Sequence, residues 1–168
     1  MATLREWPRG AVVVFVLVAL YYLLPLDGRA WWLGVAAGLL AVVALAPLAV
    51  RQVGRVMRSA RPLREAIGGL AVLLALLVLG FATTYYSLDE HDPGQVEGLE
   101  TKTDALYLSM AIVSTVGFGD VHPADQAARG VAVGQMAADV VAIAVVARLV
   151  TSAAKQRFES MRPGEPSL

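Results

Sequence analysis

Four long apolar stretches constrain the fold of this chain more than any other feature of its sequence. They cover residues 10–26, 30–50, 66–88 and about 126 to beyond 150, and the first two contain no charged residue. A helix needs about 20 apolar residues to cross a hydrocarbon core roughly 30 Å thick. Because 57% of the 168 residues are hydrophobic and only 17% are charged, a soluble domain of this size would expose large apolar patches. We therefore expect an all-α membrane protein with four transmembrane helices.

The first apolar stretch admits two interpretations. Arg5 and Arg9 precede a short apolar run, which is also the pattern of a secretory signal peptide. No cleavage site of the Ala-x-Ala type occurs around residues 25–29. The sequence therefore favours a helix that is retained in the membrane.

Charged residues are distributed unevenly over the loops. The loop between the second and third stretches is basic, and both chain ends carry Lys or Arg, whereas the acidic residues Asp27, Asp89, Glu90, Asp92, Glu97, Glu100, Asp104, Asp120 and Asp125 lie on the other side. Short loops rich in Lys and Arg stay in the cytoplasm. We expect a multi-pass protein of the cell membrane with both termini in the cytoplasm.

The basic loop carries arginines at intervals of three or four residues, which is also the spacing of a voltage-sensor helix. These arginines follow an apolar span instead of interrupting it, and the first two spans contain no acidic counter-charges. The pattern favours a cytoplasmic anchor with affinity for anionic lipid. The residues concerned are Arg51, Arg55, Arg58 and Arg61.

A short glycine-containing stretch, Ser114 to Asp120, precedes the fourth apolar span. Its central residues, Thr115 to Gly119, form a ribbon able to point successive backbone carbonyls to one side. This requires positive φ at some positions, and Gly117 and Gly119 can adopt it. A row of carbonyl oxygens can replace the hydration shell of a cation. Since one ribbon cannot surround an ion, the stretch needs copies around an axis, most simply four.

The run Thr-Val-Gly-Phe-Gly-Asp resembles the selectivity filter of the tetrameric potassium-channel superfamily, whose common form has Tyr where this chain has Phe118. The resemblance extends back over residues 103–114 as a pore helix and forward to about residue 149. It implies a prokaryotic-type subunit whose two-helix pore domain follows two additional transmembrane helices, assembled as a homotetramer. It also implies potassium as the permeant ion, with no other cofactor, bound at Thr115, Val116, Gly117 and Phe118, and a filter that ends with Gly119.

Residues around this stretch are expected to support it. Thr101 or Thr103 would cap the pore helix, with Asp104 in its first turn. In the resemblance, Asp120 accepts a hydrogen bond from an aromatic residue of the pore helix, and the matching position is Tyr107. Ala111 stands where some relatives have a buried Glu, which puts the rigidity of the filter in doubt.

Asp139 lies where, counted from Gly119, many relatives have a flexible glycine in the inner helix. A carboxylate within a membrane span costs roughly 2.5–3.5 kcal/mol on insertion scales, so it should face a cavity or a partner. One interpretation is a hydrogen bond to a neighbouring helix or to Gln135, one turn earlier. The other is a ring of four acids beneath the filter that binds internal polyvalent blockers.

Other classes of function have little support in the sequence. There is no cysteine, only two histidines, and no membrane-embedded Ser–His or carboxylate pair, so we do not expect an enzyme. The cluster at residues 89–92 (Asp-Glu-His-Asp) is either a divalent-cation site or, on our interpretation, part of a solvated acidic vestibule. Membrane lipid, but no nucleic acid, is expected as a further partner.

Three segments follow from these patterns. Residues 1–65 would hold two transmembrane helices and the basic linker, residues 66–154 the pore domain, and residues 155–168 a short cytoplasmic tail. The function expected is passive potassium conduction. The alternatives are a non-selective monovalent cation channel on the same scaffold and a membrane adaptor that does not conduct.

Overall fold

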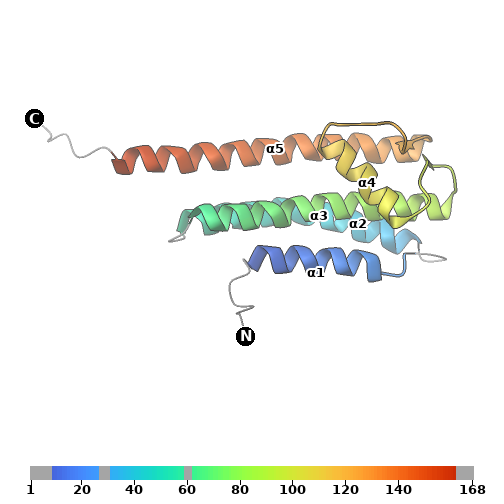
Figure 1. Cartoon of the computed structure of the whole chain (residues 1–168), viewed down its shortest axis with the longest axis horizontal. Coiled ribbons are helices and arrows are strands. Elements are labelled where there is room, and N and C mark those ends of the chain that lie inside the picture. The colour runs from blue at the N-terminus through green and yellow to red at the C-terminus, as the bar shows by residue number, and fades with distance from the viewer. Residues whose placement is uncertain (1–8, 27–30, 59–61, 162–168) are drawn as a thin grey trace, which may run out of the picture.

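The structure, a computed structural model, describes residues 9–26, 31–58 and 62–161 of the chain. Five helices and two very short strands follow one another in the order α1 (Arg9–Leu23), α2 (Trp31–Arg58), α3 (Pro62–His91), β1 (Val96–Glu97), α4 (Lys102–Val113), β2 (His122–Pro123) and α5 (Gln126–Met161) (Figure 1). The strands hold only two residues each, so the expected all-α architecture is confirmed.

Three helical segments of the described chain are long and apolar enough to cross a membrane: Trp31–Gln52, Ile67–His91 and Gln126–Ala147. Helix α1 is equally apolar but contains only 15 residues. At 1.5 Å per residue it is about 22 Å long, which is shorter than a hydrocarbon core of roughly 30 Å. The first of the four expected spans is therefore shorter than its apolar stretch indicated.

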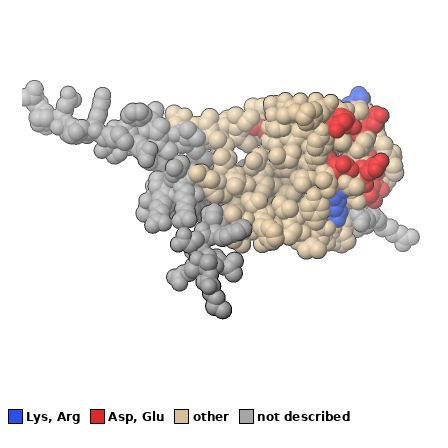
Figure 2. Space-filling view, viewed as in Figure 1, with Lys and Arg blue, Asp and Glu red and all other residues tan. Residues whose placement is uncertain are grey.

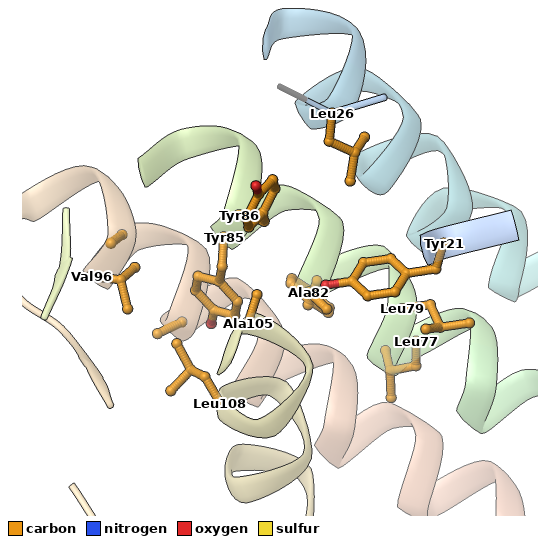
Figure 3. Packing of buried hydrophobic residues seen from close by; sticks show 13 residues of the cluster. Tyr21, Leu26, Leu77, Leu79, Ala82, Tyr85, Tyr86, Val96, Ala105 and Leu108 are labelled. Atoms are coloured by element: carbon orange, nitrogen blue, oxygen red, sulfur yellow. The ribbon is translucent and has the colours of Figure 1, made fainter. Parts of the chain in front are cut away.

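Helix α3 is the centre of the subunit, because α1, α2, α4 and α5 all pack against it (Figure 1). Every residue from 77 to 87 of this helix is buried. Tyr85, whose side chain is fully buried, points from α3 towards Ala105 and Leu108 of α4 (Figure 3). The apolar core therefore lies where the short helix α4 meets the long central helix.

Small residues let the helices approach α3 closely. A Cβ atom at Gly38 of α2 would clash with Thr84 and lie 2.5 Å from the Gly80 carbonyl oxygen, and one at Gly10 of α1 would lie 2.7 Å from the Gly68 carbonyl oxygen. Between helices in lipid, such contacts replace the hydrophobic driving force that operates in water. Both N-terminal helices are thus packed closely against α3.

Acidic side chains gather at one end of the molecule, where α3 ends and α4 begins (Figure 2). The C-terminal part of α2, which carries the exposed Arg51, lies at the opposite end of the bundle (Figure 1). The side chains of Arg55 and Arg58, and all of Arg61, lie outside the described part. Arg51 and the acidic cluster therefore lie at opposite ends of the long axis of the bundle.

Candidate functional site

The short helix α4 begins with a well-formed cap. The Thr101 side chain accepts a hydrogen bond from the Asp104 backbone N–H, and the Asp104 carboxylate accepts one from the Thr101 N–H at 2.7 Å. Partial desolvation opposes ionisation of Asp104, but hydrogen bonds donated by Thr101 and Glu100 outweigh it and hold the pKa of this carboxyl below its usual value. Of the two expected capping residues, the structure selects Thr101. The negative charge of Asp104 also lies at the positive end of the helix dipole.

The chain turns back at the other end of α4, and the turn is stabilised by the helix itself. The Ser114 hydroxyl donates to the Met110 carbonyl at 2.7 Å. The backbone N–H groups of Val116 and Gly117 both point to the Ala111 carbonyl, at 3.1 and 3.4 Å. Because an Ala at position 111 has no polar side chain, this support behind the ribbon comes from its backbone oxygen.

The ribbon that follows has alternating backbone handedness. Positive φ occurs at Thr115 (58°), Gly117 (55°) and Gly119 (81°), with the residues between them outside the left-handed region. The positive φ expected at the two glycines is confirmed, whereas that at Thr115 was not expected. A non-glycine residue in this region costs free energy and is found where the surroundings impose it, often at functional sites.

Side chains of the ribbon are largely exposed within the single subunit. Val116 is 54% exposed and Phe118 is 74% exposed. A Cβ atom added at Gly117 or Gly119 would meet no atom within 4 Å. The ribbon therefore has an open surface within the subunit, where further copies of the chain can pack.

Asp120 is held beside the ribbon by the hydrogen bond that the sequence predicted. The Tyr107 hydroxyl lies 2.8 Å from Oδ1 and 3.1 Å from Oδ2 of Asp120, and donates to this carboxylate. This hydrogen bond raises the pKa of Tyr107, because it stabilises the protonated hydroxyl. The Tyr107 ring also lies nearly parallel to Phe118, with ring centroids 6.4 Å apart. Tyr107 of α4 thus contacts both the ribbon and the acid after it.

The loop before α4 packs against the chain at Asp120, where the ribbon ends. Strand β1 pairs antiparallel with β2, so that Glu97 lies opposite His122. Gly98 has a φ of 78°, and a Cβ atom there would lie 2.5 Å from the Asp120 carbonyl oxygen. Asp89 accepts hydrogen bonds from the N–H groups of Gly94 and Val96, at 3.1 and 2.9 Å. The loop is therefore internally bonded.

The acidic cluster at residues 89–92 is spread over several structural roles. Asp89 organises the loop backbone, Asp92 accepts a hydrogen bond from Gln95 at 2.8 Å, and the His91 ring stacks on Trp31 at 3.9 Å. No group of three His, Cys, Asp or Glu residues in the described ranges is arranged to hold a metal ion. The arrangement of the described residues gives no support to a divalent-cation site.

A buried polar cluster lies behind α4. Gln135 of α5, which is fully buried, accepts a hydrogen bond from the Tyr85 hydroxyl at 3.0 Å. Its amide nitrogen donates to the carbonyl and the hydroxyl of Ser109, at 2.9 and 3.0 Å. Gln135 therefore joins α3, α4 and α5. The sequence analysis did not predict this role. The signal that could have indicated it is a Gln within an apolar span, because an amide buried there without a partner is costly.

Asp139 lies on the same face of α5 as Gln135, Ala132 and Ala128, and this face is turned towards the other helices of the subunit. It is 6% exposed, and neither carboxylate oxygen has a hydrogen-bond partner in the described part of the chain. The expected hydrogen bond with Gln135 is not formed, because Ser109 and Tyr85 occupy that amide. A cavity-lining side chain would be exposed in a single subunit, so this placement does not agree with an acidic ring beneath the filter.

The open face of α5 carries apolar side chains instead. Val133, Met136 and Val140 are 66%, 53% and 67% exposed and follow each other at helical spacing. They lie on a different face of α5 from Gln135 and Asp139, because residues three, four and seven apart share one side of a helix. This is the side of α5 that is free to face a cavity or other copies of the chain.

Comparison with known proteins gives one match. A model of the protein family described as "Ion channel" matches residues 73–156, half of the chain, from within α3 almost to the end of α5. The match includes α4, the ribbon and Asp120. No curated protein and no solved structure matches the chain significantly.

Proposed function

This chain belongs to the ion channel family, and we propose that it conducts potassium passively through a filter built from Thr115, Val116, Gly117, Phe118 and Gly119. The carbonyl oxygens of these residues would replace the hydration shell of the ion. The observation that carries this proposal is the alternation of positive φ at every second residue of the ribbon. Such alternation turns successive carbonyls towards one side.

The surroundings of the ribbon support a cation as the ligand. Helix α4 ends at Val113, directly before it, so the negative end of the helix dipole lies close to the ribbon. The acidic side chains at the same end of the molecule would raise the local cation concentration (Figure 2). Asp120, held by Tyr107, fixes the outer end of the filter.

The proposal requires several copies of the chain, and four is the number we propose. Each subunit contains one ribbon, and its open surface and the apolar face of α5 offer the contacts for a symmetric assembly. The acidic end would face outwards and the basic end would lie in the cytoplasm, where Arg51 and its neighbours would contact anionic lipid.

Ion substitution in single-channel recordings tests the proposal. The purified protein would be reconstituted in planar bilayers with potassium on one side and sodium on the other. We expect a large reversal potential, of the sign that opposes the flow of potassium, because sodium would carry little current. A reversal potential near zero would instead identify a non-selective cation channel, and absence of current over a range of voltage and pH would favour a non-conducting adaptor.

Two glycine substitutions provide a matched pair for these recordings. Gly119→Ala places a Cβ atom at a φ of 81°, where the backbone strain of an L-residue opposes the filter conformation. Gly130→Ala, in the regular part of α5, meets no atom within 4 Å and adds a better helix former. We expect loss of selective current in the first variant and wild-type current in the second.

A further inference from the structure

The C-terminal end of α1 is bonded to the first residues of the pore helix α4. The Tyr21 hydroxyl donates to the Lys102 carbonyl at 2.6 Å. In return, the Lys102 ammonium donates to the Leu24 carbonyl at 2.7 Å and to the Tyr22 carbonyl at 3.3 Å. The Tyr22 hydroxyl lies 3.2 Å from the Thr103 hydroxyl. These contacts join segments that lie about 80 residues apart in the sequence.

Lys102 acts as a C-cap for a helix to which it does not belong. The last carbonyls of a helix have no partner within the helix, and the last turn favours a positive charge. Helix α1 has no basic residue in its own last turn. The Lys102 ammonium supplies both the donors and the charge from α4, and it also lies 5.7 Å from the centre of the Tyr86 ring of α3.

Tyr21 is a buried anchor and not a surface contact. It is 2% exposed, and its ring reaches from α1 across α3 beside Ala82 (Figure 3). Packing of the ring therefore fixes the position of the hydroxyl that donates to the Lys102 carbonyl. Near the other end of α1, the close approach of Gly10 to Gly68 fixes the helix against α3. Helix α1 is therefore attached to the rest of the subunit near both ends.

The helix α4 connects this attachment to the ribbon. It extends from Lys102 to Val113 and is about 18 Å long at 1.5 Å per residue. At its far end the Ala111 carbonyl holds the N–H groups of Val116 and Gly117, and in its middle Tyr107 holds Asp120. A shift of α4 at Lys102 would therefore move the groups that hold both ends of the filter.

We infer that Tyr21 and Lys102 are positioning residues for the filter, so that the N-terminal helix α1 sets the orientation of the pore helix and thereby ion selectivity. This inference rests on the proposed conduction through the ribbon. It gives α1 a role in selectivity, although its residues lie outside the part of the chain that matches the ion channel family.

The test uses the full-length protein and two substitutions that remove the bonds in different ways. Tyr21→Phe keeps the buried ring and all charges but removes one donor, whereas Lys102→Met removes the three-donor ammonium. Lys102→Arg is the conservative rescue, and Phe15→Leu, at a 71% exposed position of α1, is the matched control. The sodium-to-potassium permeability ratio would be measured in bilayers. Hydrogen exchange of the α4 amides would be measured on the same samples.

We expect the permeability ratio and the exchange rates of the α4 amides to rise in Tyr21→Phe and in Lys102→Met. The rise in exchange should be about 2- to 10-fold, the factor that loss of one ordinary hydrogen bond produces in an opening equilibrium. Lys102→Arg should restore most of both properties, and Phe15→Leu should change neither. Tyr21→Phe alters no charge. If both variants raise the permeability ratio and the exchange rates, the cause therefore cannot be a changed surface potential.

The other outcomes distinguish failure of this inference from failure of the proposed function. Faster exchange in both variants with a wild-type permeability ratio would show that α1 holds the pore helix but does not set selectivity, which overturns the inference. Wild-type exchange in both variants would overturn it as well, and needs no conduction to be observed. Absence of current in the wild-type protein would refute the proposed function, and exchange alone would then decide whether α1 orients α4.

Discussion

Replacement of Asp139 tests how the subunit tolerates a buried carboxyl without a partner. The side chain is 6% exposed and both of its oxygens lack a hydrogen-bond partner in the described part of the chain. An unsatisfied buried polar group costs about 1–3 kcal/mol, and a charged one within a membrane span roughly 2.5–3.5 kcal/mol. Asp139→Leu removes this cost and adds apolar contact with α3. We expect the free energy of unfolding to rise by about 1–3 kcal/mol.

The matched variant is Asp139→Asn, which has nearly the same shape but no charge. It keeps two polar atoms without partners, so its gain should be smaller than that of the leucine variant. Denaturant titration in detergent micelles, followed by near-ultraviolet circular dichroism, would give the two free energies. A loss of more than about 1 kcal/mol in both variants would refute the reasoning. It would show that the carboxyl finds a partner in the assembled protein.

The placement of Asp139 also changes what is expected from conduction measurements. A ring of acids in the cavity would bind internal magnesium or polyamines, and Asp139→Asn would then relieve their block. Because the side chain faces the helices of its own subunit, we expect the block to remain unchanged in this variant. Reduced block at matched voltages would show that the side chain reaches the conduction path.

Three further predictions concern the frame around the filter. Gln135→Leu removes the partner of the Tyr85 hydroxyl and of the Ser109 carbonyl and hydroxyl, so the free energy of unfolding should fall by about 2–5 kcal/mol, measurable by the same titration. Gly98→Ala places a side chain at a φ of 78°, with its Cβ atom 2.5 Å from the Asp120 carbonyl oxygen. We expect this variant to lower the potassium selectivity measured by reversal potential. An unchanged permeability ratio would show that the loop at Gly98 can shift without disturbing the filter. The lowered pKa of Asp104 means that its carboxylate stabilises the fold above its ordinary pKa of 3.8 and that this contribution is lost as the pH falls through the folded value. Between about pH 5 and 2, Asp104→Ala should therefore flatten the acid decline in stability, and a decline equal to that of the wild type would contradict the assignment.

The sequence was sufficient to predict features that depend on local chemistry. Apolar stretches predicted helices because lipid leaves backbone groups no other partners than those within a helix. The Thr101–Asp104 cap followed from spacing, and positive φ at Gly117 and Gly119 followed from the absence of a Cβ atom. The hydrogen bond from Tyr107 to Asp120 followed from the family resemblance.

Other features depend on how distant segments meet, and the sequence alone did not contain them. The positive φ of Thr115 is imposed on a residue that does not favour it. The rotation of α5 about its axis determines whether Asp139 faces a cavity or the other helices of the subunit. Because most residues of this helix are apolar, its sequence does not define that rotation. Lys102 meets Leu24 only because α3 brings residues 78 positions apart together.

The bond between Lys102 and the end of α1 has a consequence for biogenesis. Helix α1 is translated before α4, is shorter than a bilayer core and has no basic residue in its last turn. Until residue 102 has been synthesised and α4 has folded, α1 would lie in a locally thinned bilayer without this cation. The docking of α1 should therefore follow the synthesis and folding of α4, which lies about 80 residues later in the chain.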